Sequence, residues 1–342
     1  MLRASAVRTS IWGCTIVTNN SGEGKVTISN GYLNQSCDAT YYGTISNGSS
    51  NCLSSSNYYV TIGNDPNISN IAGRENTALG QLSLSSNTTG YRNTALGSQS
   101  SRAGTTASLN TSVGYYTLRS NITGSNNTAI GYETMGANTT GVQNTVVGLK
   151  ALWKNISGSN NNAVGSYALT NSLTASELNA FGTFSLSNNT TGIQNSAFGH
   201  ATLQNNTTGT SNTAMGYNTL NLNTTGYSNT AMGDNALYNN TTGIDNTAMG
   251  LKSLYTNTTG YSNTAIGNGA LQNNSSGFRN ISVGGLFTNT TGSNNIIIGT
   301  FADVSNSTVS NEITLGNSSI TKLRSMVTSI TSLSDRRDKT DI

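Results

Sequence analysis

Few residues of this 342-residue chain carry side chains suited to nucleophilic or metal chemistry. The three cysteines, Cys14, Cys37 and Cys52, all stand near the start of the sequence, and their spacing lacks the paired short intervals of a zinc site. Three thiols cannot pair completely, so a disulfide framework is not expected. The single histidine, His200, stands in a repeated phrase whose neighbouring copies include Tyr and Asp at this position. We therefore expect neither a metal nor a cofactor, and interpret these residues as structural.

The carboxylates do not form the arrangement that hydrolytic chemistry needs. Cleavage of a polysaccharide takes two carboxylates across a groove. The acidic residues of this chain do not recur at one position of the repeat, which would pair them on neighbouring copies; they include Glu75, Glu133, Glu177, Asp234 and Asp245. Carboxylates of different chains would still be free to meet across an interface. We do not expect an enzyme.

The bulk composition argues against several classes of partner. Only 8% of the residues are charged, and a net charge of +3 with dispersed Lys and Arg does not favour nucleic acid. No apolar run approaches the roughly 20 residues that span a bilayer, so no membrane partner is expected. The opening MLRASAVRTSIWGCTIV has no uninterrupted apolar core, which argues against a secretory signal. Unpaired thiols without such a signal favour assembly in a reducing cytosol.

A fixed period organises most of the chain. Phrases such as NTALG each close on a glycine, and these glycines recur at every seventeenth position from Gly63 to Gly284, followed by a shorter step to Gly299 and a regular one to Gly316. Upstream, the phrase TISNG occurs twice, one full period apart, and a 15-residue step then leads to Gly63. The periodic region therefore runs from about residue 27 to residue 316. Such a period predicts stacked identical units.

Each repeat has three regularly apolar positions. They are a small residue such as Ala78, a larger one directly after it, such as Leu79, and a Leu four residues after the glycine, such as Leu84. No helical period fits them, whereas short strands joined by Asn and Gly turns do. We therefore predict an all-β protein in which each repeat is one 17-residue coil of a parallel β-solenoid, or β-roll. Roughly seventeen coils at about 4.8 Å each would give a rod about 80 Å long.

The polar residues have structural roles in this prediction. The Asn of the NTAxG phrase is expected to stack into an amide ladder, through Asn76, Asn93, Asn127 and Asn144. The glycines of the NTTG turns are expected to adopt positive φ, as at Gly90, Gly124 and Gly192. The Asn-x-Thr sites are explained by turn geometry without glycosylation, for example at Asn87, Asn121, Asn189 and Asn240.

The pairing of a small and a large apolar residue predicts an outward apolar stripe. Ala78 and Leu79 are adjacent in a strand, so their side chains point to opposite faces. One face fills the interior of the coil, and the other presents successive apolar side chains from Ile62 to Val283. Such a stripe is far larger than soluble monomers expose. We therefore expect copies of the chain to bury their stripes against one another around a common axis.

The repeats resemble those of known fibrous proteins. The phrase NTAIGYETMGANTTGVQNTVVG is similar to the head repeats of trimeric autotransporter adhesins, where β-rolls of three chains pack around a three-fold axis. It resembles more closely the repeat shafts of viral and phage tail fibres. The adhesin repeat is typically shorter than 17 residues, so the similarity lies in the residue types of the repeat and not in its length. The resemblance covers residues 27 to 316 and implies a homotrimeric fibre.

The C-terminal segment EITLGNSSITKLRSMVTSITSLSDRRDKTDI resembles the junction into an endosialidase-type intramolecular chaperone. In that family the chaperone trimerises, guides folding of the fibre, and cuts itself off before a Ser-Asp pair. The resemblance places this pair at Ser334 and Asp335, with Arg337 and Lys339 completing the motif, and implies a cut after Leu333. A hydroxyl beside the scissile carbonyl can take the acyl group. Almost all of the chaperone domain is missing, so this chain alone is not expected to cleave; the alternative is a charged, solvated tail.

These expectations combine into a structural and adhesive function. We expect residues 1–26 to form an N-terminal cap or virion attachment segment, 27–316 the shaft, and 317–342 the transition to the chaperone. The partners would be further copies of the chain, a virion attachment protein, and a host-surface glycan or other receptor. The fibre would be assembled in the host cytoplasm and act on the virion surface or extracellularly.

Several alternatives remain open at this point. A bacterial cell-surface adhesin would need a signal peptide, a coiled-coil stalk and a membrane anchor, none of which is recognised in the sequence. An ice-binding solenoid would use a regular array of Thr77, Thr94, Thr128 and Thr145, and thermal hysteresis would reveal it. Tyrosines are interpreted as packing at coil edges, with sugar stacking as the alternative: Tyr91, Tyr115, Tyr217, Tyr227, Tyr238 and Tyr261.

Overall fold

The computed structural model describes residues 72–284 and 290–321, together with the backbone of five strands nearer the N-terminus. Every regular element of these residues is a β-strand. The strands are β1 (Arg8–Ile11), β2 (Cys14–Val17), β3 (Thr27–Asn30), β4 (Gly43–Ser46), β5 (Tyr59–Gly63), β6 (Asn76–Leu79), β7 (Thr94–Leu96), β8 (Thr111–Val113), β9 (Thr128–Ile130), β10 (Thr145–Val147), β11 (Asn162–Val164), β12 (Asn179–Phe181), β13 (Ser196–Phe198), β14 (Thr213–Met215), β15 (Thr230–Met232), β16 (Thr247–Met249), β17 (Thr264–Ile266), β18 (Ile281–Val283), β19 (Ile296–Ile298) and β20 (Ile313–Leu315).

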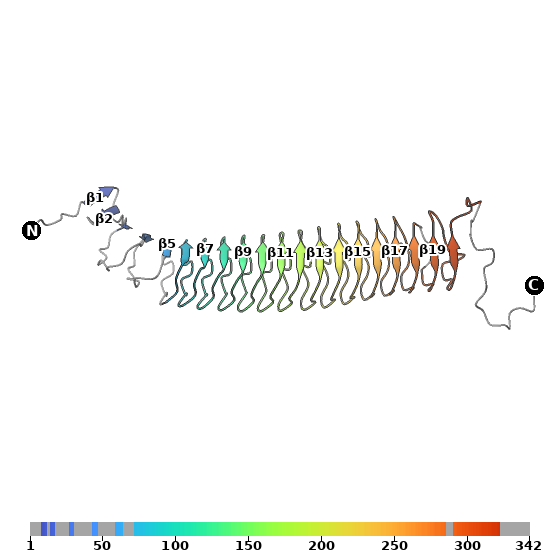
Figure 1. Cartoon of the computed structure of the whole chain (residues 1–342), viewed down its shortest axis with the longest axis horizontal. Coiled ribbons are helices and arrows are strands. Elements are labelled where there is room, and N and C mark those ends of the chain that lie inside the picture. Colours follow the sequence, from blue (N-terminus) through green and yellow to red (C-terminus); the bar gives the residue numbers. More distant parts are fainter. Residues whose placement is uncertain are drawn as a thin grey trace, which may run out of the picture.

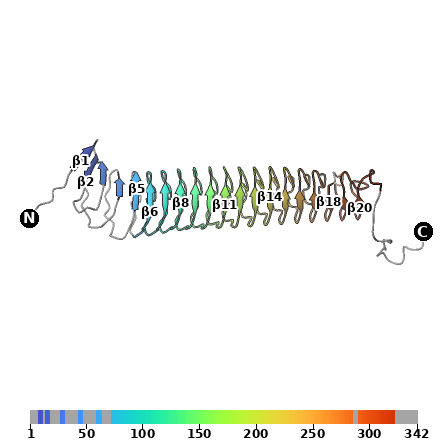
Figure 2. The same cartoon turned by 45° about the horizontal axis from the view of Figure 1, so that its top comes forward.

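The strands stack as one parallel ladder, which confirms the β-solenoid. Each strand from β3 to β20 pairs in parallel with the next, and the coils follow one another into a rod (Figure 1, Figure 2). Val146 in β10 lies opposite Ala163 in β11, its equivalent in the next repeat. The predicted 15-residue step appears between β18 and β19, where Ile281 lies opposite Ile296. From β6 onward the chain closes each coil with a constant number of residues except at this step.

The register upstream of β6 corrects one expectation. The sequence predicts a 15-residue step between the second TISNG phrase and Gly63, but Gly63 lies opposite Ser46, a full period earlier. Ile45 likewise pairs with Ile28 on one side and Ile62 on the other. The register therefore aligns the isoleucines of successive strands, and the glycine of TISNG is not the equivalent of the closing glycine. The strands before β3 do not follow the parallel arrangement. Strand β2 pairs antiparallel with both β1 and β3.

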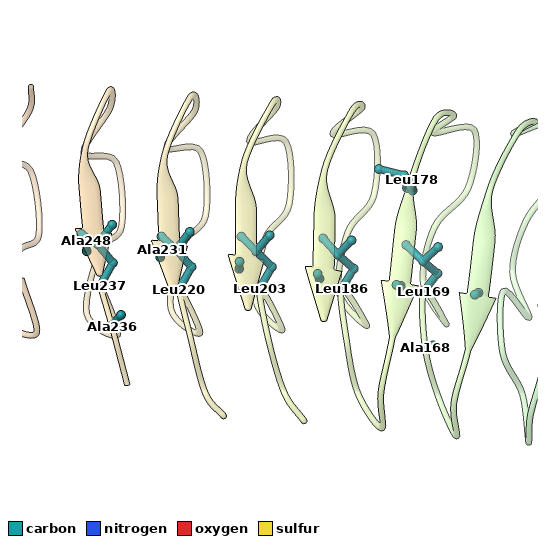
Figure 3. Close-up of a cluster of buried hydrophobic side chains, with 14 of the residues drawn as sticks. Ala168, Leu169, Leu178, Leu186, Leu203, Leu220, Ala231, Ala236, Leu237 and Ala248 are labelled. Atoms are coloured by element: carbon teal, nitrogen blue, oxygen red, sulfur yellow. The ribbon is translucent and has the colours of Figure 1, made fainter. Parts of the chain in front are cut away.

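The interior of the rod is filled by two apolar columns, as predicted. The central Ala of the strand is fully buried in successive coils, as at Ala231 and Ala248, and so is the Leu of the following turn, as at Leu220 and Leu237. These leucines lie above one another from coil to coil (Figure 3). Each coil adds only a few apolar side chains, so a coil is buried by its neighbours and not by itself.

The turn after each strand depends on backbone conformations that L-residues seldom adopt. The closing glycines from Gly80 to Gly267 have φ between 125° and 141°. A Cβ on Gly216 would also stand 2.7 Å from the carbonyl oxygen of Gly233 in the next coil. The buried Leu that follows sits in the left-handed region, with φ of 51° at Leu220. The closing glycine is therefore required both by its φ and by the closeness of the next coil.

The NTTG glycines correct a second expectation. None of Gly90, Gly124 and Gly192 has the positive φ that turn chemistry suggests. Their hydrogen atoms instead face the neighbouring coil. A Cβ on Gly124 would stand 2.3 Å from Oδ1 of Asn121 and 2.4 Å from the carbonyl oxygen of Gly141. Glycine is needed at this position because the backbone and a buried amide approach it closely, not because of its conformational freedom.

The coil of residues 166–182 departs from the repeat and leaves buried polar groups without partners in the described part of the chain. In residues 166–182 the chain has Ser172 in place of the NTTG asparagine and Ala175 in place of its glycine. Oδ1 of Asn155, one coil earlier, and Oγ of Ser172 are both buried without a hydrogen-bond partner among the described residues. In the coil before, the equivalent oxygen accepts the amide of the next Asn, since Asn138 Oδ1 accepts from Asn155 Nδ2 at 2.7 Å. An unsatisfied buried acceptor costs about 1 to 3 kcal/mol.

Restoring the repeat in this coil is expected to stabilise the rod. The double variant Ser172→Asn with Ala175→Gly supplies an amide donor to Asn155 and an acceptor to the next asparagine. We expect the free energy of unfolding to rise by about 1 to 3 kcal/mol, measured by chemical denaturation followed by circular dichroism. Ser172→Asn alone serves as the control, because Ala175 would crowd the new side chain. A double variant no more stable than the parent would contradict this account.

Candidate interaction surface

The sheet presents an apolar surface that the described residues of the chain leave uncovered. The residue after the central residue of each strand points outward and is half-buried or exposed, with 44% of Met215 and 51% of Leu315 accessible. We call this column the outer stripe. It comprises Leu79, Leu96, Val113, Ile130, Val147, Val164, Phe181, Phe198, Met215, Met232, Met249, Ile266, Val283, Ile298 and Leu315. The predicted outward stripe is thus present in the single chain.

A column of small polar residues runs beside the outer stripe. Thr94 and Leu96 flank the buried Ala95, and both are half-exposed. The same alternation holds in the next coils, as in β9, where Thr128 and Ile130 flank Ala129. These threonines therefore share the outward face of the sheet with the outer stripe. The face carries one column made mostly of Thr beside the apolar column of the outer stripe.

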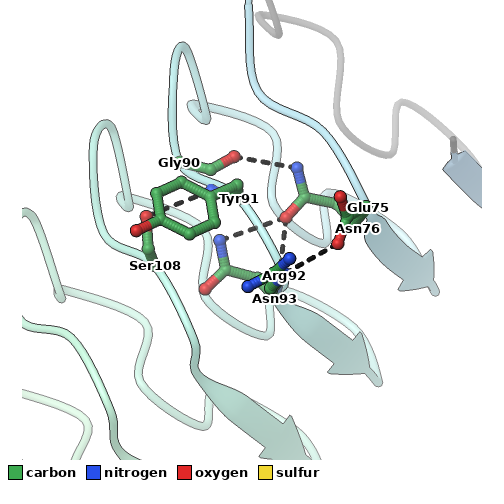
Figure 4. A network of polar contacts seen from close by, with 7 residues as sticks. All are labelled: Glu75, Asn76, Gly90, Tyr91, Arg92, Asn93 and Ser108. Carbon is green, nitrogen blue, oxygen red and sulfur yellow. Dashed lines mark hydrogen bonds and ion pairs between the residues drawn. The ribbon is translucent and has the colours of Figure 1, made fainter. Parts of the chain in front are cut away.

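The predicted amide ladder is present along the start of the strands. Nδ2 of Asn93 donates to Oδ1 of Asn76 at 3.1 Å, and the backbone N–H of Asn93 donates to the same oxygen at 2.9 Å. Nδ2 of Asn76 also donates to the carbonyl of Gly90 at 2.9 Å (Figure 4). The residues of this first Asn ladder are almost fully buried. Each amide therefore satisfies backbone groups of its own coil and of the next.

A second Asn ladder, which the sequence reasoning missed, runs through the NTTG turns. Nδ2 of Asn240 donates to Oδ1 of Asn223 at 2.8 Å and to the carbonyl of Gly243 at 3.1 Å. The signal available in the sequence was the recurrence of this Asn in most repeats, at the same 17-residue spacing as the Asn of the first ladder. The ladder comprises Asn87, Asn121, Asn138, Asn155, Asn189, Asn206, Asn223, Asn240, Asn257 and Asn274.

This burial bears on the Asn-x-Thr sites. Four of the ladder residues are the sequons named above, and 0% of the surface of Asn189 and Asn240 and 1% of that of Asn87 and Asn121 is accessible. The amide nitrogen to which an N-glycan would be attached therefore lies inside the folded rod. Turn and ladder geometry accounts for the motif, and a glycan on these asparagines is incompatible with the fold.

The aromatic side chains mostly stack on one another along the rod. Tyr115 stacks on Tyr132 with ring centroids 5.5 Å apart, and His200 stacks on Tyr217 at 5.2 Å. Tyr238 and Tyr261 do the same with the aromatic residues one coil later. The edges of Tyr91, Tyr115, Tyr217 and Tyr227 remain exposed. Packing at the coil edge, including that of His200, explains the stacked rings.

Several carboxylates face a cation or an amide one coil away. Glu75 pairs with Nε of Arg92 at 2.7 Å (Figure 4), and Glu133 pairs with Nζ of Lys150 at 3.5 Å. Glu177 accepts a hydrogen bond from Gln194 at 2.9 Å. The hydrogen bond from Arg92 lowers the pKa of Glu75, so this pair is lost as the pH falls through that lowered value. Exposed pairs of this kind contribute little to stability.

The remaining sequence predictions concern residues that the structure does not describe. Ser334, Asp335 and the cut after Leu333 lie beyond residue 321, and Cys37 and Cys52 also fall outside the described residues. Cys14 is placed only as part of the backbone of β2. Within the described part, no group of His, Cys, Asp and Glu is arranged to hold a metal ion. The same residues include no helix with the length and apolarity that a membrane crossing requires.

The outer stripe is thus an apolar surface that runs along the described rod. Its apolar column and its flanking threonines come from the 17-residue register, which holds the same residue types in line from coil to coil. No protein-family model, no curated protein and no solved structure matches this chain.

Proposed function

We propose that this chain is the shaft of a homotrimeric fibre, of the kind that viruses and phages use to attach to a host surface. The observation that carries the proposal is the outer stripe, which runs from Leu79 to Leu315 without a charged residue. An apolar surface of this extent is expected to be covered in solution. Identical chains stacked side by side about a common axis would cover all the stripes at once.

The proposal assigns no catalytic step to the shaft. The residues that would attach it to a virion are 1–26, before the first strand of the parallel ladder, and residues 317–342 would form the transition to a chaperone that guides trimerisation. The surface not used between the chains would carry the contact with a host glycan or another receptor. A rod whose strands from β6 to β20 carry no charged residue suits such a spacer.

The mass of the intact particle tests the proposal. Light scattering under native conditions should give a value near three times 35.5 kDa. Substituting Phe181→Asp and Phe198→Asp together should convert the trimer to a monomer. The two rings stack on each other in the outer stripe, which the proposed trimer buries, so the new carboxylates would be removed from water without a partner. The matched control is Thr191→Asp with Thr208→Asp, two exposed positions on the turn side of the coils. A parent that runs as a monomer would contradict the fibre.

A second candidate is favoured by one specific observation. The regular Thr and apolar columns on the sheet are also the type of surface that could order water, as an ice-binding solenoid does. In that case the stripe would stay exposed and the chain would be monomeric. Thermal hysteresis of a monomeric sample would support this function, whereas a trimer without hysteresis would exclude it.

A further inference from the structure

The charges of the rod are segregated along its length. Between residues 76 and 176 the chain carries five cations and one acid, Glu133. Between residues 178 and 251 it carries Asp234 and Asp245 and no Lys or Arg. The cations look dispersed in the sequence, but the period brings several of them to one side. Arg102 and Arg119 stand at the same position of successive repeats, and Trp153 follows in the same column two coils later.

These cations lie against aromatic rings on the turn that follows the strand. Cζ of Arg119 is 4.8 Å from the ring centroid of Tyr116. Nζ of Lys150 is 5.2 Å, and Nζ of Lys154 5.9 Å, from the ring centroid of Trp153. The second and fifth residues after the closing glycine therefore face each other in this part of the rod. Cations over aromatic rings are attracted to the ring face.

Hydrogen bonds and packing join these groups into one surface. Nη1 of Arg102 donates to Oε1 of Gln99 at 3.1 Å, and Nε2 of Gln99 donates to the hydroxyl of Tyr116 at 3.1 Å. Trp153 packs against Gly136 in the preceding coil, where a Cβ would stand 3.1 Å from the indole Cδ1. The absence of a side chain at Gly136 makes room for the indole between Arg119 and the rest of the column.

The positive charge of this surface is largely uncompensated. Lys150 pairs with Glu133 at 3.5 Å, but neither Arg102, Arg119 nor Lys154 forms an ion pair within the described residues. None of these residues belongs to the outer stripe, so burying the stripe between chains does not use them. We call Arg102, Arg119, Lys150, Lys154, Tyr116 and Trp153 the basic patch. It spans three coil steps, or about 14 Å at about 4.8 Å per coil.

We propose that the basic patch binds an anionic glycan lying along the rod. Guanidinium groups bind carboxylate and sulfate oxygens through paired hydrogen bonds, and ammonium groups add point charges. Aromatic side chains offer flat faces on which the apolar side of a sugar ring can pack. The alternation of cations and aromatic rings along three coils matches a polymer with repeating acidic sugars better than a single small anion. This inference names the ligand class for the proposed host attachment and rests on that proposal.

The test uses the full chain with four soluble polymers. Heparin supplies sulfates, polysialic acid supplies carboxylates, dextran is neutral, and a duplex DNA supplies phosphates without sugar rings exposed for packing. We expect heparin or polysialic acid to bind with an affinity that falls as salt is added, and dextran not to bind. DNA that binds as tightly as both glycans would overturn the assignment of a glycan ligand. Failure of both acidic glycans to bind would overturn it as well.

Variants locate the binding on the rod. Arg119→Gln with Lys154→Gln should weaken glycan binding at least tenfold. The matched control is Lys252→Gln with Arg279→Gln, which removes two cations that also lie near aromatic rings, at 5.9 Å each, but outside the patch. Equal effects of both variants would contradict the proposed location. The native mass of the same samples separates the two proposals: a trimer that binds no acidic glycan rejects only this inference, whereas a monomer that binds one through the patch rejects only the fibre.

Discussion

Replacing Gly226 by Ala should lower the free energy of unfolding by about 3 kcal/mol, although the change adds one methyl group in a surface turn. The new Cβ would stand 2.3 Å from Oδ1 of Asn223 and 2.5 Å from the carbonyl oxygen of Gly243. Both are held in place, the amide by the second Asn ladder and the carbonyl by the next coil. The added atom must therefore push the coils apart or displace the ladder. Chemical denaturation followed by circular dichroism measures the loss.

The matched control for this change is Gly104→Ala. Gly104 also lies in a turn and has no positive φ, but the nearest atom to its Cβ would be a carbonyl oxygen at 3.4 Å. The substitution should change stability by less than about 1 kcal/mol, because the space is open and the unfolded chain loses some freedom. Equal losses at Gly104 and Gly226 would show that crowding of the ladder is not the cause.

The chain itself indicates how the loss at Gly226 can be reduced. In two coils the Asn of the second ladder is replaced, by Gly104 and by Ser172. In both coils the NTTG glycine three residues later is replaced as well, by Ala107 and by Ala175. Asn223→Ser should therefore cost less in the presence of Gly226→Ala than alone. We expect a double-mutant cycle to give a favourable coupling of about 1 to 2 kcal/mol. Additive effects of the two changes would contradict a direct contact between these positions.

Removing one amide of the first ladder should have a comparably large effect. Oδ1 of Asn229 accepts hydrogen bonds from both the backbone N–H and Nδ2 of Asn246, each at 3.1 Å. Nδ2 of Asn229 donates to Gly243 at 2.8 Å and to Asn212 at 3.1 Å. Asn229→Ala leaves several buried groups without partners at once. We expect the free energy of unfolding to fall by about 4 kcal/mol, since each such group costs about 1 to 3 kcal/mol.

A surface amide provides the control for this prediction. Nδ2 of Asn188 donates to Oδ1 of Asn205 at 3.0 Å in a half-exposed column. Water can replace that partner, so Asn188→Ala should cost less than about 1 kcal/mol in the same denaturation experiment. A loss of stability at Asn188 as large as at Asn229 would mean that the side-chain hydrogen bonds themselves, and not their burial, determine the loss in the free energy of unfolding.

Much of the architecture was predictable because neighbouring coils have equal length. A constant 17-residue step places each residue beside its equivalent, so the strand register, the buried Ala column and the first Asn ladder follow from the spacing. Alternation along a strand likewise determined that Met232 points out where Ala231 points in. Upstream of β6 the glycine spacing predicts the wrong register at Gly63, because the strands there align their isoleucines and not their glycines.

What the period leaves open is the path of the chain within one coil. The spacing says that Gly124 recurs, but only the closed coil shows that its neighbours are Asn121 and the next backbone, so that close approach and not φ requires a glycine there. In the same way Lys150 and Trp153 meet only because the turn folds their side chains together. A repeat determines contacts between coils, since these join equal positions. Contacts across a coil join different positions, and their distances depend on its three-dimensional cross-section.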